Sequence, residues 1–212
     1  MTETEVRRDL VRVARRLDAR GILTATDGNL SARLPGGRIL ITPAGCCKGT
    51  VEPGDLVVVS LDGRTEPDGR PSSELPLHRT IYENRADIGA VVHAHPPYAT
   101  AYAVAGIPLD RPILSEAILV LGDVPVVPYA TPGGEALGRQ VATRLNGTRA
   151  LLLANHGAVS FGVSIDEAGA RMECLEQVAR IDWLSRFLGP REIGVDQVRE
   201  LIAMRDGVRE SS

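Results

Sequence analysis

Lysine is almost absent from this chain of 212 residues, in which Lys48 is the only lysine among 24 basic residues. A mechanism that passes through a Schiff base needs a lysine amine. Lys48 follows the turn-rich segment 42–45, a poor position for such a role. If the chain carries out carbonyl chemistry, we expect it to stabilise a carbanion by other means.

Aromatic residues make up only 3% of the chain, and the formal net charge is −3, with arginines scattered among acids. A nucleic-acid surface combines a basic stripe with stacking aromatic rings. We therefore expect no nucleic-acid partner.

Long apolar runs are also missing. None approaches the ~20 residues of a membrane-spanning helix, and residues 1–12 are charged where a secretory signal would be apolar. The three cysteines, Cys46, Cys47 and Cys174, are too few for a disulfide framework. These absences predict a cytoplasmic protein with reduced thiols and no membrane partner.

Helical and strand patterns alternate along the chain. Apolar residues recur at helical spacing before Gly21 and over residues 166–188, where Met172, Trp183 and Phe187 share one stripe. Short turns between strands favour antiparallel pairing. We predict an α/β fold in a single domain, residues 1–212: a three-layer αβα sandwich around a mixed, largely antiparallel sheet. The predicted strands are 39–42, 56–61, 90–95, 124–127, 150–154 and 159–162; the remaining helices are 74–84 (capped by Ser72 or Ser73), 98–104, 135–145 and 195–204.

Two histidines stand at the end of one predicted strand, in Val91-Val92-His93-Ala94-His95-Pro96. Side chains alternate across a strand, so His93 and His95 project from the same face and can share a metal ion. They could equally be two exposed histidines at a strand end.

His156 favours the metal interpretation, because it lies in a tight Asn-His-Gly turn after the apolar strand 150–154. Three imidazoles leave one or two coordination positions open, as catalytic metal sites do. Zinc is the first expectation, with manganese, iron, cobalt and nickel as alternatives.

Three further polar side chains are candidates near such a site. Glu74 begins a predicted helix. It could act as a general base, or its negative charge could simply stabilise the helix through the helix dipole. Glu116 lies in an apolar stretch. It is either a second catalytic carboxylate or an acid with a structural role, such as capping a helix. His78, four residues after Glu74, is either a support for the site or a hydrogen-bonded structural residue.

Small polar residues and glycines form three turn-like segments, 26–31, 42–45 and Ser72-Ser73. Backbone N–H groups at such turns and at a helix N-terminus bind phosphate, although ordinary turns and caps use the same residues.

Five ordered segments together resemble the class II aldolase/adducin family, and the match runs from about residue 5 to about residue 188. They are Gly28-Asn29-Leu30-Ser31, Thr42-Pro43-Ala44-Gly45, Ser72-Ser73-Glu74, His93-Ala94-His95 and Asn155-His156-Gly157. The chain resembles most the members that cleave fuculose 1-phosphate and other ketose 1-phosphates.

The resemblance implies a homotetramer in which His93, His95 and His156 bind zinc and Glu74 serves as the base. Zinc would stabilise the enediolate left when the C3–C4 bond of a ketose 1-phosphate breaks, releasing dihydroxyacetone phosphate and an aldehyde. The positions that match the family's phosphate site are Thr26, Gly28, Asn29, Gly45, Ser72 and Ser73.

The chain departs from the fuculose-phosphate enzymes at two points. They carry a tyrosine near position 116 and another in the C-terminal tail, whereas this chain has Glu116 and no tyrosine after Tyr129. The acid that protonates the aldehyde oxygen is therefore open.

Enzymes on the same scaffold suggest further functions. Glu116 also resembles the acid/base of methylthioribulose-1-phosphate dehydratase, although the flanking Ser115 and Leu119 differ from that enzyme. Pentulose-phosphate 4-epimerases usually carry aspartate at the position of Glu74. A metal-dependent decarboxylase is a further candidate, and so is an adducin-like interaction module without catalysis.

Overall fold

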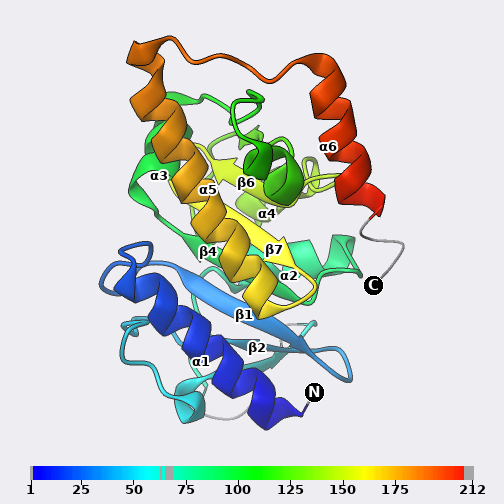
Figure 1. Cartoon of the computed structure of the whole chain (residues 1–212). Coiled ribbons are helices and arrows are strands. Elements are labelled where there is room, and N and C mark those ends of the chain that lie inside the picture. The colour runs from blue at the N-terminus through cyan, green and yellow to red at the C-terminus, as the bar shows by residue number, and fades with distance from the viewer. Residues whose placement is uncertain (1, 63, 65–68, 208–212) are drawn as a thin grey trace.

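The structure, a computed structural model, describes residues 2–62, 64 and 69–207, and its central element is one sheet. Among these residues seven strands pair in the order β3-β2-β1-β4-β7-β6-β5 (Figure 1). All neighbours are antiparallel except β5 with β6. The predicted mixed, largely antiparallel sheet is confirmed. The strands are β1 (Asn29–Leu34), β2 (Arg38–Ile41), β3 (Val57–Ser60), β4 (Ala90–Ala94), β5 (Val126–Val127), β6 (Ala150–Leu153) and β7 (Gly157–Gly162).

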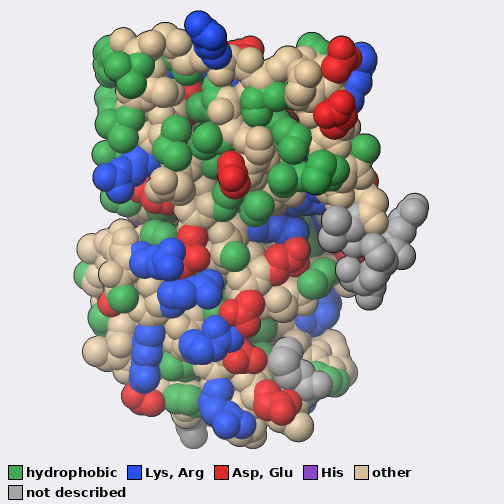
Figure 2. Space-filling view, in the orientation of Figure 1, with side chains coloured by type: hydrophobic (Ala, Val, Ile, Leu, Met, Phe, Trp, Pro, Cys, Tyr) green, Lys and Arg blue, Asp and Glu red, His purple; other side chains and the backbone are tan. Residues whose placement is uncertain are grey.

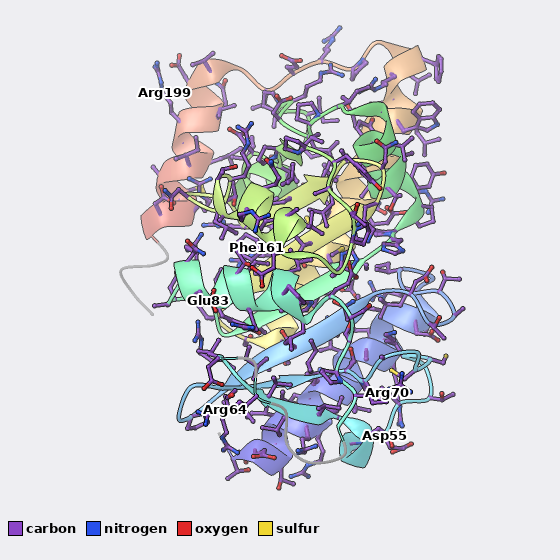
Figure 3. The ribbon with its side chains drawn as sticks, turned by 180° about the vertical axis from the view of Figure 1, so that it is seen from behind. Asp55, Arg64, Arg70, Glu83, Phe161 and Arg199 are labelled. Atoms are coloured by element: carbon purple, nitrogen blue, oxygen red, sulfur yellow. The ribbon has the colours of Figure 1, made fainter. Side chains whose placement is uncertain are left out.

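Helices cover both faces of this sheet. One apolar core joins α1, α3 and α5 to one face, and a second core joins α2 and α4 to the other. Figure 1 shows α1 and α5 crossing in front of the strands, and Figure 3 shows α2 on the opposite side. The helices are α1 (Glu3–Ala19), α2 (Leu75–Asn84), α3 (Pro97–Ala105), α4 (Glu135–Ala142), α5 (Ile165–Ser185) and α6 (Val195–Gly207), with short turns η1 (Pro53–Asp55), η2 (Ala117–Leu121, a π-helix) and η3 (Arg186–Leu188).

Alternation along β4 decides which face carries the polar residues. Val92 packs into the α1/α3/α5 core, whereas Val91 packs into the α2/α4 core. Since alternate side chains share a face, His93 points to the same side as Val91. In β1, Asn29 pairs with His93 and Ser31 with Val91, which places both polar residues on that side too. The face covered by α2 therefore carries the candidate site.

The first helix follows the sequence pattern closely. Thr2 and Glu5 form a capping box at its start, and the apolar residues at helical spacing are buried against the sheet. Burial of that stripe rather than propensity alone holds the helix in place.

Several local predictions are wrong. The second half of the turn-like segment 26–31 instead belongs to β1 (Asn29–Leu34), an inner strand of the sheet. Helix α2 begins at Leu75, one residue later than expected, and Glu74 occupies the cap position; Ser72 instead accepts a hydrogen bond from the Glu74 N–H. Of the stripe predicted over residues 166–188, Met172 in α5 is buried, but Trp183 near the end of α5 is 47% exposed and Phe187 in η3 is 83% exposed.

The face seen in Figure 2 carries mixed charges over α1 and mainly apolar side chains above it. Arginines of α1 form ion pairs with acids of α5, such as Arg12 with Asp166 and Arg16 with Glu173. No helix among the described residues combines the length and apolar character that crossing a membrane requires.

Candidate active site

Three histidines from two neighbouring strand ends meet on the face covered by α2. His93 lies in β4 and His95 just after it, while His156 lies in the tight turn between β6 and β7. One nitrogen from each imidazole lies within 4.8 Å of the others. The ring centroids are 4.7 to 5.0 Å apart. The three histidines therefore lie together, as the sequence predicted.

The hydrogen bonds of His93 require a positive charge beside it. Its Nδ1 is 2.9 Å from the carbonyl oxygen of Ala158, which can only accept, so Nδ1 carries a proton. Its Nε2 faces Glu74 Oε2 at 2.9 Å and His95 Nε2 at 3.1 Å. In neutral His93 that Nε2 is a bare lone pair directed at a carboxylate oxygen. A second proton or a bound cation must therefore lie there.

Glu74 completes this group from the N-terminal end of α2. Its Oε1 lies 3.3 Å from His156 Nε2, is buried and has no hydrogen-bond partner among the described residues. Burial alone would raise the pKa of Glu74, but hydrogen bonds from His93 and Asn29 outweigh it and hold that pKa below its usual range. Glu74 is therefore a carboxylate, ready to bind a cation or to accept a proton.

The donor set suits a divalent transition metal. Burial lowers the pKa of His156 to about 4 and also lowers that of His95, so both imidazoles are neutral, the form that binds metals. Two imidazole nitrogens on one zinc, each at about 2.0–2.1 Å, lie about 3 Å apart, close to the separation between His93 Nε2 and His95 Nε2. A proton on His93 Nδ1 bonded to a backbone carbonyl is the support that metal-binding histidines commonly have.

Behind Glu74 runs a buried chain of hydrogen bonds whose direction is fixed. The carboxylate can only accept, so Asn29 Nδ2 donates to Glu74 Oε2 at 2.9 Å. The amide oxygen of Asn29 then accepts from His78 Nε2. His78 Nδ1 in turn accepts from the Ser31 hydroxyl at 2.6 Å, and Ser31 accepts from Tyr82 at 2.8 Å.

His78 is fully buried, and burial lowers its pKa to about 3. It is therefore neutral, with its proton on Nε2. Sequence reasoning left His78 open between a support for the site and a structural histidine. Its contacts make it both, because it is buried in the core and fixes the amide of Asn29 beside Glu74.

Two glycines allow the chain to approach the histidines closely. Gly28 has a φ of +69°, and a Cβ there would lie 2.6 Å from the carbonyl oxygen of His93. A Cβ on Gly157 would lie 2.4 Å from Cδ2 of His95. Larger residues at these positions would displace the strand end or the ring.

The three turn-like segments predicted to bind phosphate lie against one another. The N–H of Thr42 donates to the carbonyl of Leu30 at 3.0 Å, and the N–H of Ser72 donates to the carbonyl of Thr42 at 3.2 Å. Gly45, with a φ of +69°, ends the second segment. Thr26, Gly45 and Ser73 are exposed, whereas Ser72 is buried. The structure thus brings the three segments together, with Asn29 bonded to Glu74 and Ser72-Ser73 directly before it.

The remaining candidate, Glu116, is exposed at the start of η2, near Cys174 of α5. No hydrogen bond or ion pair within the described part of the chain joins it to the histidines. Sequence reasoning, in contrast, overlooked Asp27, whose carboxylate lies 3.6 Å from His95 Nδ1.

A family model for the class II aldolase and adducin N-terminal domain matches residues 8–183. The chain belongs to this family. It is 35% identical over 207 residues, 96% of both chains, to 3-oxo-tetronate 4-phosphate decarboxylase of Escherichia coli K12. It is 33% identical over 205 residues, 95% of both chains, to 5-deoxy-D-ribulose 1-phosphate aldolase of Bacillus thuringiensis serovar kurstaki.

Among solved structures, L-fuculose-1-phosphate aldolase of Thermus thermophilus superposes with a TM-score of 0.79 at 35% identity, over 88% of this chain and 98% of that one. The resemblance to class II aldolases and the predicted fold class are therefore confirmed. The class II aldolase family includes relatives named for two reactions, aldol cleavage and decarboxylation.

Proposed function

We propose that this class II aldolase family member is a lyase that cleaves a ketose 1-phosphate to dihydroxyacetone phosphate and an aldehyde. The observation that carries the proposal is the meeting of three imidazoles with the Glu74 carboxylate at one point. Such a cluster can hold a cation next to a base. Forming a carbanion next to a ketone needs both, because the cation stabilises the negative charge and the base moves the proton.

His93, His95 and His156 would hold the metal, for which zinc is our first choice. When bound, it supplies a Lewis acid that polarises the substrate ketone and stabilises negative charge on the enediolate oxygens. The Ala158 carbonyl fixes the orientation of the His93 ring. Every other part of the chemistry falls to side chains of this chain.

Glu74 would move the proton at the three-carbon product. Cleavage leaves a carbanion next to the ketone, which must be protonated to give dihydroxyacetone phosphate, and synthesis requires the reverse transfer. Glu74 is held for this task by Asn29, so the carboxylate loses little conformational freedom in the reaction. Its contacts with His93 and His156, and its place directly after Ser72 and Ser73, support this role.

Thr26, Gly28, Asn29, Gly45, Ser72 and Ser73 would bind the substrate phosphate. Phosphate binding far from the broken bond orients the substrate and contributes remote binding energy. Glu116 would take the proton of the C4 hydroxyl in cleavage and return it to the aldehyde oxygen in synthesis. From the family resemblance we also propose a homotetramer, which light scattering of the purified protein would test.

Decarboxylation of a 3-oxo acid phosphate is the second candidate, because the relatives at 35% identity bear that name. Loss of CO2 from 3-oxo-tetronate 4-phosphate leaves the same enediolate of dihydroxyacetone phosphate as aldol cleavage does. A carboxylate loses CO2 without giving up a proton, whereas cleavage of a ketose 1-phosphate must remove the proton of the C4 hydroxyl. A decarboxylase would therefore tolerate the lack of the family's tyrosine acids.

One assay decides between the two. The metal-loaded protein is incubated separately with fuculose 1-phosphate, 5-deoxyribulose 1-phosphate, methylthioribulose 1-phosphate and 3-oxo-tetronate 4-phosphate. We expect dihydroxyacetone phosphate and an aldehyde from a ketose 1-phosphate. Release of CO2 from the fourth compound alone would establish the decarboxylase, and loss of water without carbon–carbon cleavage would establish a dehydratase.

The role of Glu74 is tested with Glu74→Gln, which keeps the size of the side chain. We expect kcat to fall by about 10²- to 10⁴-fold, the usual contribution of a general acid or base, with metal content unchanged. Glu83→Gln, on the exposed part of the same helix, is the matched control (Figure 3). Equal kcat values for the two variants would exclude Glu74 as the base.

A further inference from the structure

Lys48 is buried, although the loop that carries it is partly exposed. Only 2% of its surface is accessible, whereas the preceding Gly45 is exposed and Cys46 and Cys47 are half-buried. Lysine side chains are rarely buried unless a partner compensates their charge. The position of the chain's only lysine therefore calls for an explanation.

The Lys48 ammonium lies between two of the turns that would bind phosphate. Its Nζ donates to the carbonyl oxygen of Thr26 at 2.6 Å and to that of Cys46 at 2.9 Å. Thr26 begins one turn, and Cys46 directly follows Gly45 at the end of the other. An ammonium has three N–H groups, so these two carbonyls leave one for another acceptor.

Neutral carbonyls do not neutralise the charge of Lys48. Within the described chain no carboxylate forms an ion pair with its Nζ. Asp27 and Glu74 act on it only at longer range and favour the charged form, while burial lowers its pKa. Glu74 already has its own partners in His93 and Asn29. A buried cation in this situation gains most from a bound anion.

We propose that Lys48 is the cation that binds the phosphate group of the substrate, with its third N–H donating to a phosphate oxygen. This inference rests on the proposed function, since it assigns Lys48 to the phosphate end of that substrate. A phosphate monoester dianion fits best, because it has several acceptor oxygens for the N–H groups of both turns as well as for the ammonium. Lys48 already joins the two turns through the carbonyls of Thr26 and Cys46, so the phosphate would bind to turns that are in place before it arrives.

The first test compares Lys48→Met with wild type in the full-length, metal-loaded protein. Binding of inorganic phosphate and of glycerol 3-phosphate is measured by calorimetry, because neither compound can undergo cleavage. We expect Lys48→Met to raise both Kd values by about 10- to 100-fold, the loss that removing one charged hydrogen bond causes. Unchanged Kd values in a folded variant would overturn the proposal.

Arg149→Met is the matched control. Arg149 is also buried and donates to a backbone carbonyl, that of Leu119, at 2.8 Å. It precedes β6, at the end of that strand away from His156. We expect this variant to bind phosphate as wild type does. If both variants lose the same affinity, removal of a buried cation explains the loss, and Lys48 has no special role.

A second measurement needs no variant and decides the matter if Lys48→Met fails to fold. Since the chain has one lysine, selective ¹³Cε and ¹⁵Nζ labelling of lysine gives a single side-chain NMR signal. We expect it to shift on titration with inorganic phosphate, with the Kd found by calorimetry. A signal that stays in place at saturating phosphate would overturn the proposal.

The two proposals fail in different ways. If wild type binds neither phosphate nor glycerol 3-phosphate, the phosphorylated substrate is wrong, and the proposed function falls with the role of Lys48. If wild type binds both and Lys48→Met binds them equally well, only the role of Lys48 is wrong.

Discussion

Glu74 separates two regions of the site that differ in how completely their polar atoms are paired. On the histidine side, His156 Nδ1 and Glu74 Oε1 are buried, and no residue that the structure describes forms a hydrogen bond with either. On the other side, the chain from Asn29 to Tyr82 is continuously hydrogen-bonded in one direction. Buried polar atoms without partners are costly, whereas a satisfied network is rigid. The unpaired side is suited to receive a cation, and the paired side is suited to hold Glu74 in place.

Removing a histidine from the unpaired side should have the largest effect. We expect His93→Ala to lose its metal, with affinity falling by more than the ~10- to 100-fold that loss of a supporting residue causes. Elemental analysis after dialysis measures the metal content. His78→Gln, which removes an imidazole from the paired side, should keep its metal. Full metal occupancy in His93→Ala would contradict the three-histidine site.

A change next to the unpaired side should have an intermediate effect. In Gly157→Ala the new Cβ would meet the His95 ring and the carbonyl of Ala94, at 2.4 and 2.6 Å, so the ring must move. We expect metal affinity about 10-fold or more below wild type, although every ligand is present. Gly54→Ala, which has open space around its Cβ, is the control. Equal affinities in both variants would show that the ring position is not limiting.

The far end of the paired side should give the smallest effect. Tyr82→Phe removes the hydroxyl that donates to Ser31, and we expect the free energy of unfolding to fall by about 1 kcal/mol. Urea denaturation measures this change, with the exposed Tyr129→Phe as control. We expect kcat to change less than about 3-fold, because Ser31 can keep its bond to His78. A large fall in kcat without loss of stability would mean that this chain moves a proton rather than holding Glu74.

The sequence was most informative where chemistry and periodicity agreed. Spacing at i, i+2 placed His93 and His95 on one face, and the Asn-His-Gly turn placed His156 at a strand end, as the structure shows. Apolar spacing likewise located α1. Both patterns are local, so they can be recognised without knowing what packs against them.

Local patterns gave wrong predictions where the conformation or burial of a residue depends on what packs against it. Segment 26–31 has the composition of a turn, yet its residues from Asn29 onward are in a strand because β2 and β4 pair with β1 on both sides. Trp183 and Phe187 continue the apolar spacing of Met172 towards the end of α5 and into η3, where they are exposed. Helical spacing shows which residues share one face of the helix. It does not show how much of that face is covered by the rest of the protein.

The sequence by itself determined the family, the metal-binding histidines as candidates, and the choice of Glu74 as a base, since these depend on residue type and order along the chain. Only the tertiary structure showed that His93 Nε2 faces a carboxylate and so needs a second proton or a cation there, that His78 fixes Asn29 against Glu74, and that Lys48 is buried between two turns. The physical reason is that hydrogen-bond direction and the cost of a buried charge depend on atoms distant in sequence. Those atoms become neighbours only when β1, β4, α2 and the turns before β1 and after β2 come together.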